Sequence, residues 1–170
     1  AVRSLSPREV VYAVHSALLS IGGGNLEGYG MDAFVTAFYA VLNRPSGKLT
    51  YVRAAQDRPL WIRAGARPEP LEGNGRFLGM IDGLELQEHQ IMLQPGDNLL
   101  LYSDGVTDQM NEADESYGVE RLKAAFQAAV GESDGNQLLF IVKDIDNWRG
   151  RAPAFDDLTM LLVEAIDRSS

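Results

Sequence analysis

LLLYSDGVTD, residues 99–108, joins an apolar run to two carboxylates spaced four residues apart. The run ends abruptly at Asp104-Gly105, and Asp108 closes the stretch. Such a pattern is typical of a buried strand with a glycine turn just beyond its end. We therefore predict a strand over residues 98–103 with the carboxylate of Asp104 directly after its C-terminal end.

A second acidic pair, Asp156-Asp157, lies immediately before the last apolar run, Leu158 to Val163. Carboxylate oxygens are the ligands that magnesium and manganese ions prefer. We therefore expect Asp104 and Asp156, far apart in the chain, to converge around a shared divalent ion. Taken alone, an Asp-Gly pair is more often an ordinary turn, and Asp108 needs no function to stand where it does.

Composition narrows the function classes. The chain has 170 residues, of which 45% are hydrophobic, and a formal net charge of −9. These values predict one folded domain over residues 1–170 and disfavour nucleic acid or an anionic membrane as a partner. Cysteine is absent, and only His15 and His89 could serve a zinc-type site, so none is expected. No apolar run has membrane-spanning length and no signal-peptide pattern is present, so we expect a cytoplasmic domain.

The N-terminal part predicts a helix followed by a β-hairpin. Ser6-Pro7-Arg8-Glu9 has the pattern of a capping box with proline at the first helical position, and Gly22 to Gly24 end the helix. Residues 33–42 are apolar on both faces, which predicts a strand inside a sandwich. Residues 43–47 are expected to turn, and residues 48–55 to form the return strand.

The remaining pattern alternates short strands, turns and two amphipathic helices. We predict a strand at 60–63, a loop at 64–75, a strand at 84–93, a turn at 94–97, helices at about 118–130 and 135–148, and a strand at 158–166. The fold class is therefore α+β, with antiparallel sheets and helices packed outside them. The glycine-rich residues 22–30 are expected to form a connection and not a phosphate cradle. His15 and His89 are expected on element surfaces, and Trp61 and Trp148 in packing.

Eight pieces of the sequence stand in a characteristic order that extends along nearly the whole chain. They are Ser6-Pro7-Arg8-Glu9-Val10, residues 34–42, Gly47-Lys48-Leu49-Thr50-Tyr51-Val52, Leu78-Gly79-Met80, residues 93–97, residues 101–107, Tyr117-Gly118 and Asp156-Asp157-Leu158-Thr159. In this order and spacing they resemble the bacterial branch of the metal-dependent protein serine/threonine phosphatases, the protein phosphatase 2C-like family whose namesake is SpoIIE.

The resemblance implies a sandwich of two antiparallel sheets that holds two Mn²⁺ or Mg²⁺ ions between them. It implies hydrolysis of phosphoserine or phosphothreonine on a regulatory protein, often an anti-sigma-factor antagonist, by a metal-bridged water. Asp104 and Asp156 match metal-binding aspartates of the family, and Asp108 matches a position that helps a third, weaker metal in some relatives. Gly105, Asp157 and Thr159 are expected beside the ligands, where the Thr159 hydroxyl could orient Asp156.

The chain departs from the family pattern at two places. Further metal aspartates of the family precede the region that this chain matches, so the chain is expected to hold roughly the last two-thirds of the fold. By itself it is expected to bind metal weakly or to be inactive. Relatives usually read Ala-Gly-His-Asn-Pro-Pro where this chain has Ala54-Ala55-Gln56-Asp57-Arg58-Pro59. Gln56 cannot take up a proton near neutral pH as histidine can.

These departures leave two alternatives to a protein phosphatase open. The chain could be a non-catalytic phosphatase-like module that binds a signalling partner, or a metal-dependent hydrolase of small phosphoesters. Retention of the aspartates at 104, 108, 156 and 157 argues against the non-catalytic reading. Exposed sheet edges in a partial fold would favour association of two copies, so a homodimer stays open as well.

Overall fold

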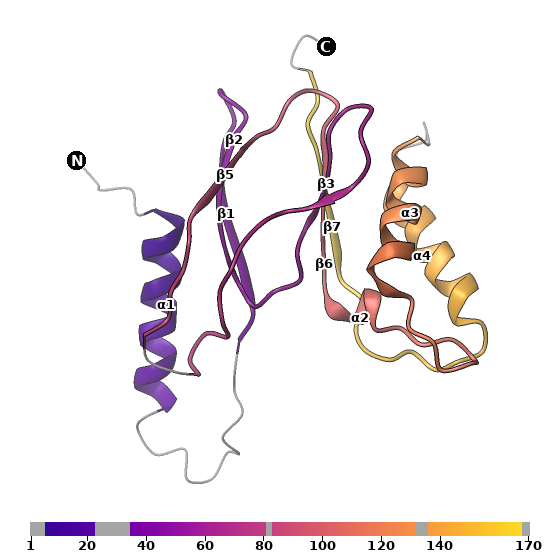
Figure 1. Cartoon of the computed structure of the whole chain (residues 1–170), viewed down its shortest axis with the longest axis horizontal. Helices are drawn as coiled ribbons and strands as arrows, with labels where there is room; N and C mark the ends of the chain where they lie inside the picture. Colours follow the sequence, from indigo (N-terminus) through magenta and orange to yellow (C-terminus); the bar gives the residue numbers. More distant parts are fainter. Residues whose placement is uncertain (1–5, 23–34, 81–82, 132–135, 168–170) are drawn as a thin grey trace. The chain divides into compact units, whose positions relative to one another are not determined.

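A computed structural model describes residues 6–22, 35–80, 83–131 and 136–167 of the chain (Figure 1). The chain forms two compact units, each assembled from two stretches of sequence. Residues 1–56 and 72–93 make the first unit, and residues 57–71 and 94–170 make the second. Both combine helix with antiparallel sheet, which confirms the predicted α+β class. Whether residues 1–170 act as a single domain stays a prediction.

In the first unit, helix α1 (Pro7–Gly22) is followed by three antiparallel strands. Strands β1 (Ala37–Asn43), β2 (Lys48–Ala54) and β5 (His89–Met92) lie in the order β1-β2-β5. The register of β1 with β2 runs from the pair Ala37 and Ala54 to the pair Asn43 and Lys48. The predicted hairpin is therefore confirmed, with its turn at residues 43–47.

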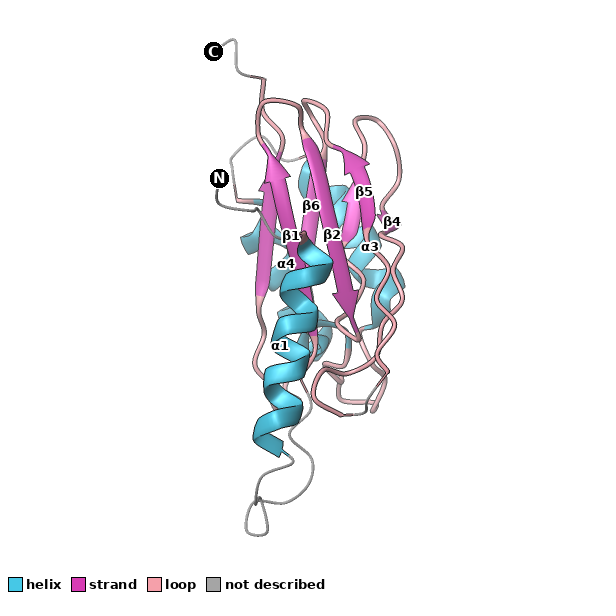
Figure 2. Cartoon of the chain, turned by 90° about the vertical axis from the view of Figure 1, so that its left-hand side faces the viewer, coloured by secondary structure: helices cyan, strands magenta, loops and turns pink. Residues whose placement is uncertain are grey.

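The predicted capping box begins helix α1. The Ser6 amide donates to Glu9 Oε2 at 2.8 Å, and the Glu9 amide donates back to Ser6 Oγ at 3.2 Å. These two bonds satisfy amides that the first helical turn leaves without a backbone partner. The helix then buries Val11 against Val52 and Ala54 of β2, and Figure 2 shows α1 lying across this sheet.

Strand β1 corrects the prediction of a strand buried on both faces. It forms one edge of its sheet, and Val41 is 46% exposed, with Tyr39 and Leu42 exposed as well. Strand β2, whose apolar residues are fewer, takes the central place and is the better buried. Apolar content alone cannot say which strand of a hairpin receives a third strand, because that depends on a distant segment. That segment, predicted as a strand over 84–93, contributes only residues 89–92.

Both histidines also differ from their expected places. His15 is only 4% exposed, and its Nδ1 accepts a hydrogen bond from the Gly79 amide at 3.1 Å. His89 is half-buried on β5, where its ring stacks on Tyr51 with ring centroids 5.5 Å apart. Each histidine thus joins a helix or strand to a distant part of its unit. Helical periodicity could not reveal this, since the loop around Gly79 supplies the partner.

The second unit holds a four-stranded antiparallel sheet in the order β4-β3-β6-β7. Its strands are β3 (Leu60–Ile62), β4 (Glu69–Pro70), β6 (Asn98–Tyr102) and β7 (Met160–Glu164). Helices α3 (Gly118–Val130) and α4 (Gln137–Arg149) lie side by side (Figure 1). They pack on one face of the sheet. The core contains Leu60, Ile62, Leu100, Tyr102, Tyr117, Leu122, Phe126, Ile141 and Ile145.

Three local predictions in this unit were too simple. The predicted loop at 64–75 contains the two-residue strand β4, and the last strand is shorter than residues 158–166. The residues from Asp104 to Thr107 form a single helical turn, α2, in place of a glycine turn. The turn at 94–97 is confirmed, with the Asp97 amide donating to Gln94 O at 2.9 Å. No helix among the described residues is long and apolar enough to cross a membrane. The predicted connection at 22–30 lies almost wholly outside the described residues.

Candidate active site at the end of strand β6

The register of β6 with β7 determines which distant residues meet. Leu100 pairs with Leu162, and Tyr102 pairs with Met160. Because the two strands are antiparallel, the residues that follow Tyr102 lie beside the residues that precede Met160. The carboxylate-bearing segment after β6 therefore adjoins the carboxylate-bearing segment before β7.

Ser103 joins these two segments by three hydrogen bonds. Its amide donates to Thr159 O at 3.0 Å, and its hydroxyl donates to Asp157 O at 3.2 Å. The Thr159 amide in turn donates to Ser103 Oγ at 3.1 Å. Ser103 thus extends the β6–β7 pairing by side chain as well as by backbone, up to the residue before Asp104.

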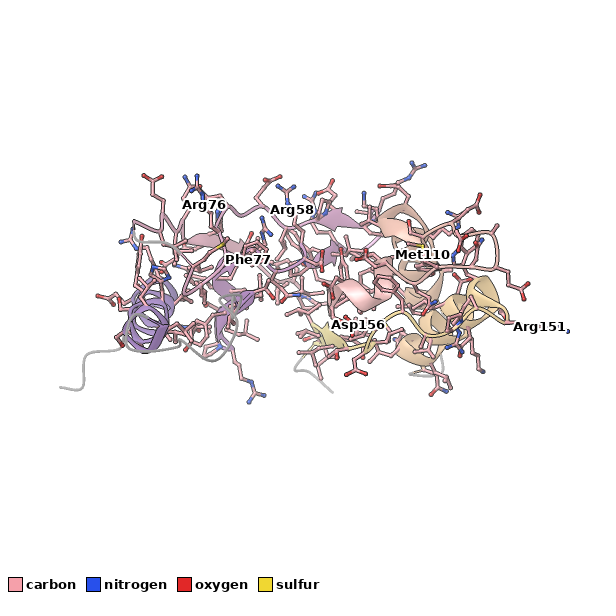
Figure 3. The ribbon with its side chains drawn as sticks, turned by 90° about the horizontal axis from the view of Figure 1, so that it is seen from below. Arg58, Arg76, Phe77, Met110, Arg151 and Asp156 are labelled. Atoms are coloured by element: carbon pink, nitrogen blue, oxygen red, sulfur yellow. The ribbon has the colours of Figure 1, made fainter. Side chains whose placement is uncertain are left out.

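Gly105 allows the closest approach of the two segments. A β-carbon added to Gly105 would lie 2.4 Å from Asp157 O and 3.4 Å from the β-carbon of Asp156. No other residue type fits at the first of these distances, since backbone atoms cannot yield as a flexible side chain can. The same contact shows that Asp156 lies against the first turn of α2, where Asp104 stands, and Figure 3 shows Asp156 beside that turn.

The carboxylates of Asp104 and Asp156 are both exposed, and each is oriented by a local backbone amide. Asp104 Oδ1 accepts from the Gly105 amide at 2.9 Å, and Asp156 Oδ1 accepts from the Asp157 amide at 2.7 Å. Neither forms an ion pair with a described residue. Both keep carboxylate oxygen facing solvent and available to a cation.

The other predicted site residues stand around this pair. Asp108 is exposed at the end of α2, and its amide donates to Asp104 O at 2.8 Å. Asp157 contributes its backbone oxygen to Ser103, and Thr159 contributes its amide and carbonyl. The contacts of Asp157 and Thr159 fix the backbone around Asp156. A role of the Thr159 hydroxyl in orienting Asp156 stays a prediction.

The donors present suit Mg²⁺ or Mn²⁺ in kind, because both ions favour carboxylate oxygen. In number they are few: among the described residues, no group of three or more histidine, cysteine, aspartate or glutamate side chains could hold a metal ion. Asp104 and Asp156 can therefore supply two carboxylates, and water or a substrate oxygen would have to complete the coordination.

Sequence reasoning missed Gln109, which lies directly after Asp108. Its side chain is buried and bonds to residues on both sides of the site: Nε2 donates to Met110 O at 2.8 Å and to Pro153 O at 3.0 Å. Its Oε1 accepts from the Phe155 amide at 3.1 Å. The only signal in the sequence is a glutamine beside an acidic motif, and that does not reveal a partner more than forty residues away.

Tyr102 lies at the end of β6, and the pKa of its hydroxyl is affected by a nearby carboxylate, that of Asp57. Burial, reinforced by the negative charge of Asp57, raises the pKa of Tyr102 to about 12. Gln56 belongs to the first unit, where its Oε1 accepts from the Thr36 hydroxyl at 2.8 Å. Its side chain therefore has a hydrogen-bonding role there.

A family model described as Stage II sporulation protein E (SpoIIE) matches residues 1–166. The chain belongs to the SpoIIE family. Among curated proteins it is 28% identical to the protein IcfG of Synechocystis over 134 residues, which cover 78% of the chain and 21% of IcfG. The SpoIIE-type chain thus spans about a fifth of that relative.

Two solved structures show the fold. The SiaA-PP2C domain of Pseudomonas aeruginosa is 21% identical, with a TM-score of 0.79 over 96% of this chain and 62% of that one. The manganese-presoaked phosphatase domain of SpoIIE from Bacillus subtilis is 13% identical, with a TM-score of 0.59 over 100% of this chain and 79% of that one. The predicted protein phosphatase 2C-like fold is therefore confirmed.

Proposed function

We propose that this SpoIIE-family chain hydrolyses phosphoserine or phosphothreonine on a regulatory protein, with Mn²⁺ or Mg²⁺ as cofactor. The observation that carries the proposal is the meeting of two carboxylate-bearing segments at the ends of β6 and β7, made close by Gly105. Membership of the SpoIIE family and the likeness to phosphatase domains agree with it.

In this proposal Asp104 and Asp156 hold the cation, and Asp108 lies near enough in sequence to assist. When bound, such an ion lowers the pKa of a coordinated water and neutralises phosphoryl oxygens. The protein's own task is to present the carboxylates in a fixed relation. The bonds of Ser103 and the local amides on Asp104 and Asp156 do this. Without a cation, the exposed carboxylates would repel a phosphate group, so phosphate and metal are expected to bind together.

The exposure of the site supports a protein as substrate. Asp104 and Asp156 are both on the surface, so a phosphorylated side chain on a folded partner could reach them without entering a deep pocket. A small phosphoester is held best by a site that surrounds it. We therefore favour a phosphorylated regulatory protein, such as an anti-sigma-factor antagonist, over a metabolite.

The decisive experiment is phosphate release by the longest protein that the gene encodes, from p-nitrophenyl phosphate and from a phosphoserine peptide, with Mn²⁺. We expect Asp104→Asn to lower turnover by about a hundredfold or more, because one charged ligand of the ion is lost. The matched control is Asp146→Asn, which changes an exposed aspartate that pairs with Arg149 on α4. Full turnover by the Asp104→Asn protein would refute the assignment.

The second candidate is a phosphatase-like module that binds a phosphorylated signalling protein without hydrolysing it. It is favoured by the small number of carboxylates that the described residues bring together and by Gln56 in place of histidine. The same assay separates the two functions. Phosphate release no faster than that of Asp104→Asn, with retained binding of the phosphorylated partner, would establish the binding module.

A further inference from the structure

The loop between α4 and β7 carries Asp156, and it has few regular backbone partners of its own. Ala152 donates to Arg149 O at 3.1 Å near the start of the loop, and the Ser103 bonds hold its end. Between these points, Pro153 and Phe155 are bound by one side chain, that of Gln109. The position of the loop immediately before Asp156 therefore depends on this glutamine.

The chemistry of the three bonds is specific for an amide. Two partners of Gln109 are carbonyl oxygens, Met110 O and Pro153 O, and both need a donor. The third partner, the Phe155 amide, needs an acceptor. A carboxylate could not donate to the carbonyls, and an apolar side chain of similar size could serve none of the three. Because Gln109 is only 4% exposed, water cannot easily replace these bonds.

Gln109 also connects the two halves of the site. It follows Asp108 directly in the chain, and its Oε1 holds the amide of Phe155, the residue before Asp156. Its own backbone oxygen accepts from the Tyr117 amide at 2.8 Å, which anchors it to the start of α3. The anchor is firm because Tyr117 is fully buried.

We propose that Gln109 is a positioning residue that holds Asp156 in the relation to Asp104 needed for binding a divalent cation. The proposal rests on the metal site of the proposed function. Gln109 does not itself bind the ion; it determines where the loop presents the carboxylate. Loss of such a supporting contact typically lowers metal affinity about ten- to a hundredfold.

The test measures Mn²⁺ binding by calorimetry in a double-mutant cycle of Gln109→Met and Asp156→Asn, in the longest protein that the gene encodes. If Gln109 acts through Asp156, Gln109→Met weakens Mn²⁺ binding about tenfold in the wild-type background but less than twofold when Asp156 is already asparagine. A general loss of structure would weaken binding equally in both backgrounds. Amide exchange of Phe155, which should become faster in Gln109→Met, reports the broken bond without metal.

The matched control is Gln137→Met on α4. Gln137 is likewise buried, and its Nε2 donates to Glu164 Oε1 at 2.9 Å, but it holds no part of the loop before Asp156. The Mn²⁺ affinity of the Gln137→Met protein should equal that of the wild type. Should Gln109→Met fail to fold, Gln109→Asn keeps the amide on a shorter side chain that cannot span all three partners, and it should show the same coupling.

The possible results separate this proposal from the proposed function. Weaker binding in Asp156→Asn together with unchanged binding in Gln109→Met would overturn the role of Gln109 and leave the metal site standing. Unchanged binding in Asp156→Asn would overturn the metal site, and the role of Gln109 with it. Coupled loss of binding in a protein that releases no phosphate would support the positioning role and reject the hydrolysis.

Discussion

Ala55 has a backbone conformation that alanine rarely adopts. Its φ is +57°, in the left-handed region, where the β-carbon crowds the backbone. The SpoIIE-like pattern usually has glycine at this position. Ala55 is therefore strained in this conformation, which glycine would adopt without cost.

We expect Ala55→Gly to stabilise the chain by about 0.5–1 kcal/mol, because relief of left-handed strain exceeds the added freedom of glycine in the unfolded chain. Urea unfolding followed by circular dichroism measures the change. The control is Ala54→Gly, a fully buried position on β2, which should destabilise by about 1–2 kcal/mol. Destabilisation by both substitutions would contradict the assigned strain.

At the level of helices and strands, predictions from short sequence patterns were confirmed where the interacting residues are close in sequence. The capping box of α1, the β1–β2 hairpin and the turn at 94–97 all depend on residues close in sequence. The helix α3 followed from apolar residues at helical spacing, and its observed bounds agree with the prediction.

The predictions that failed depend on distant partners. The edge position of β1 follows from the pairing of β2 with β5, and the burial of His15 follows from Gly79. For the site, the sequence led us to expect that Asp104 and Asp156 converge around a shared divalent ion, and this stays a prediction. Their segments adjoin because β6 pairs with β7, and Gly105 allows the close approach. It could not find Gln109 or Ser103, because neither side chain shows its role until the loop before β7 is in place.

The contrast between β1 and β2 gives a test with one type of substitution. Val41→Thr, at the exposed edge, should change the free energy of unfolding by no more than about 0.5 kcal/mol. Val52→Thr places a hydroxyl among the buried residues that pack under α1 and should cost about 1–3 kcal/mol. Urea unfolding of both variants measures the difference. Equal costs would mean that β1 is covered in solution.

At the scale of the whole molecule, the two units keep separate cores, and the candidate site belongs entirely to the second. The core of that unit contains two tyrosines with altered acidity. The pKa of Tyr102 is about 12 because of burial and the nearby charge of Asp57. Burial also raises the pKa of Tyr117, and so does the hydrogen bond from its hydroxyl to Asp144.

These pKa values predict a loss of stability in alkali. Burial disfavours the charged, deprotonated form of a tyrosine. The folded chain therefore keeps these protons at a pH where the unfolded chain has released them. The stabilisation is complete below about pH 10 and falls as the pH rises towards 12, the folded pKa of Tyr102. Urea midpoints at pH 8, 10 and 11 should fall beyond pH 10. The fall should be smaller for Tyr102→Phe, and an equal fall would exclude Tyr102 as the cause.

The antiparallel pairing of β6 with β7 has a consequence for how much this architecture can vary. The polypeptide leaves the site after Gln109 and returns to it in the loop that carries Asp156, so the residues between form an excursion that departs from and arrives at one place. Closing a longer excursion costs little extra entropy. Provided that the sheet stays covered and that Tyr117, which anchors Gln109, keeps its place, α3 can be lengthened or shortened at its C-terminal end and α4 at its N-terminal end without moving the segments that carry Asp104 and Asp156.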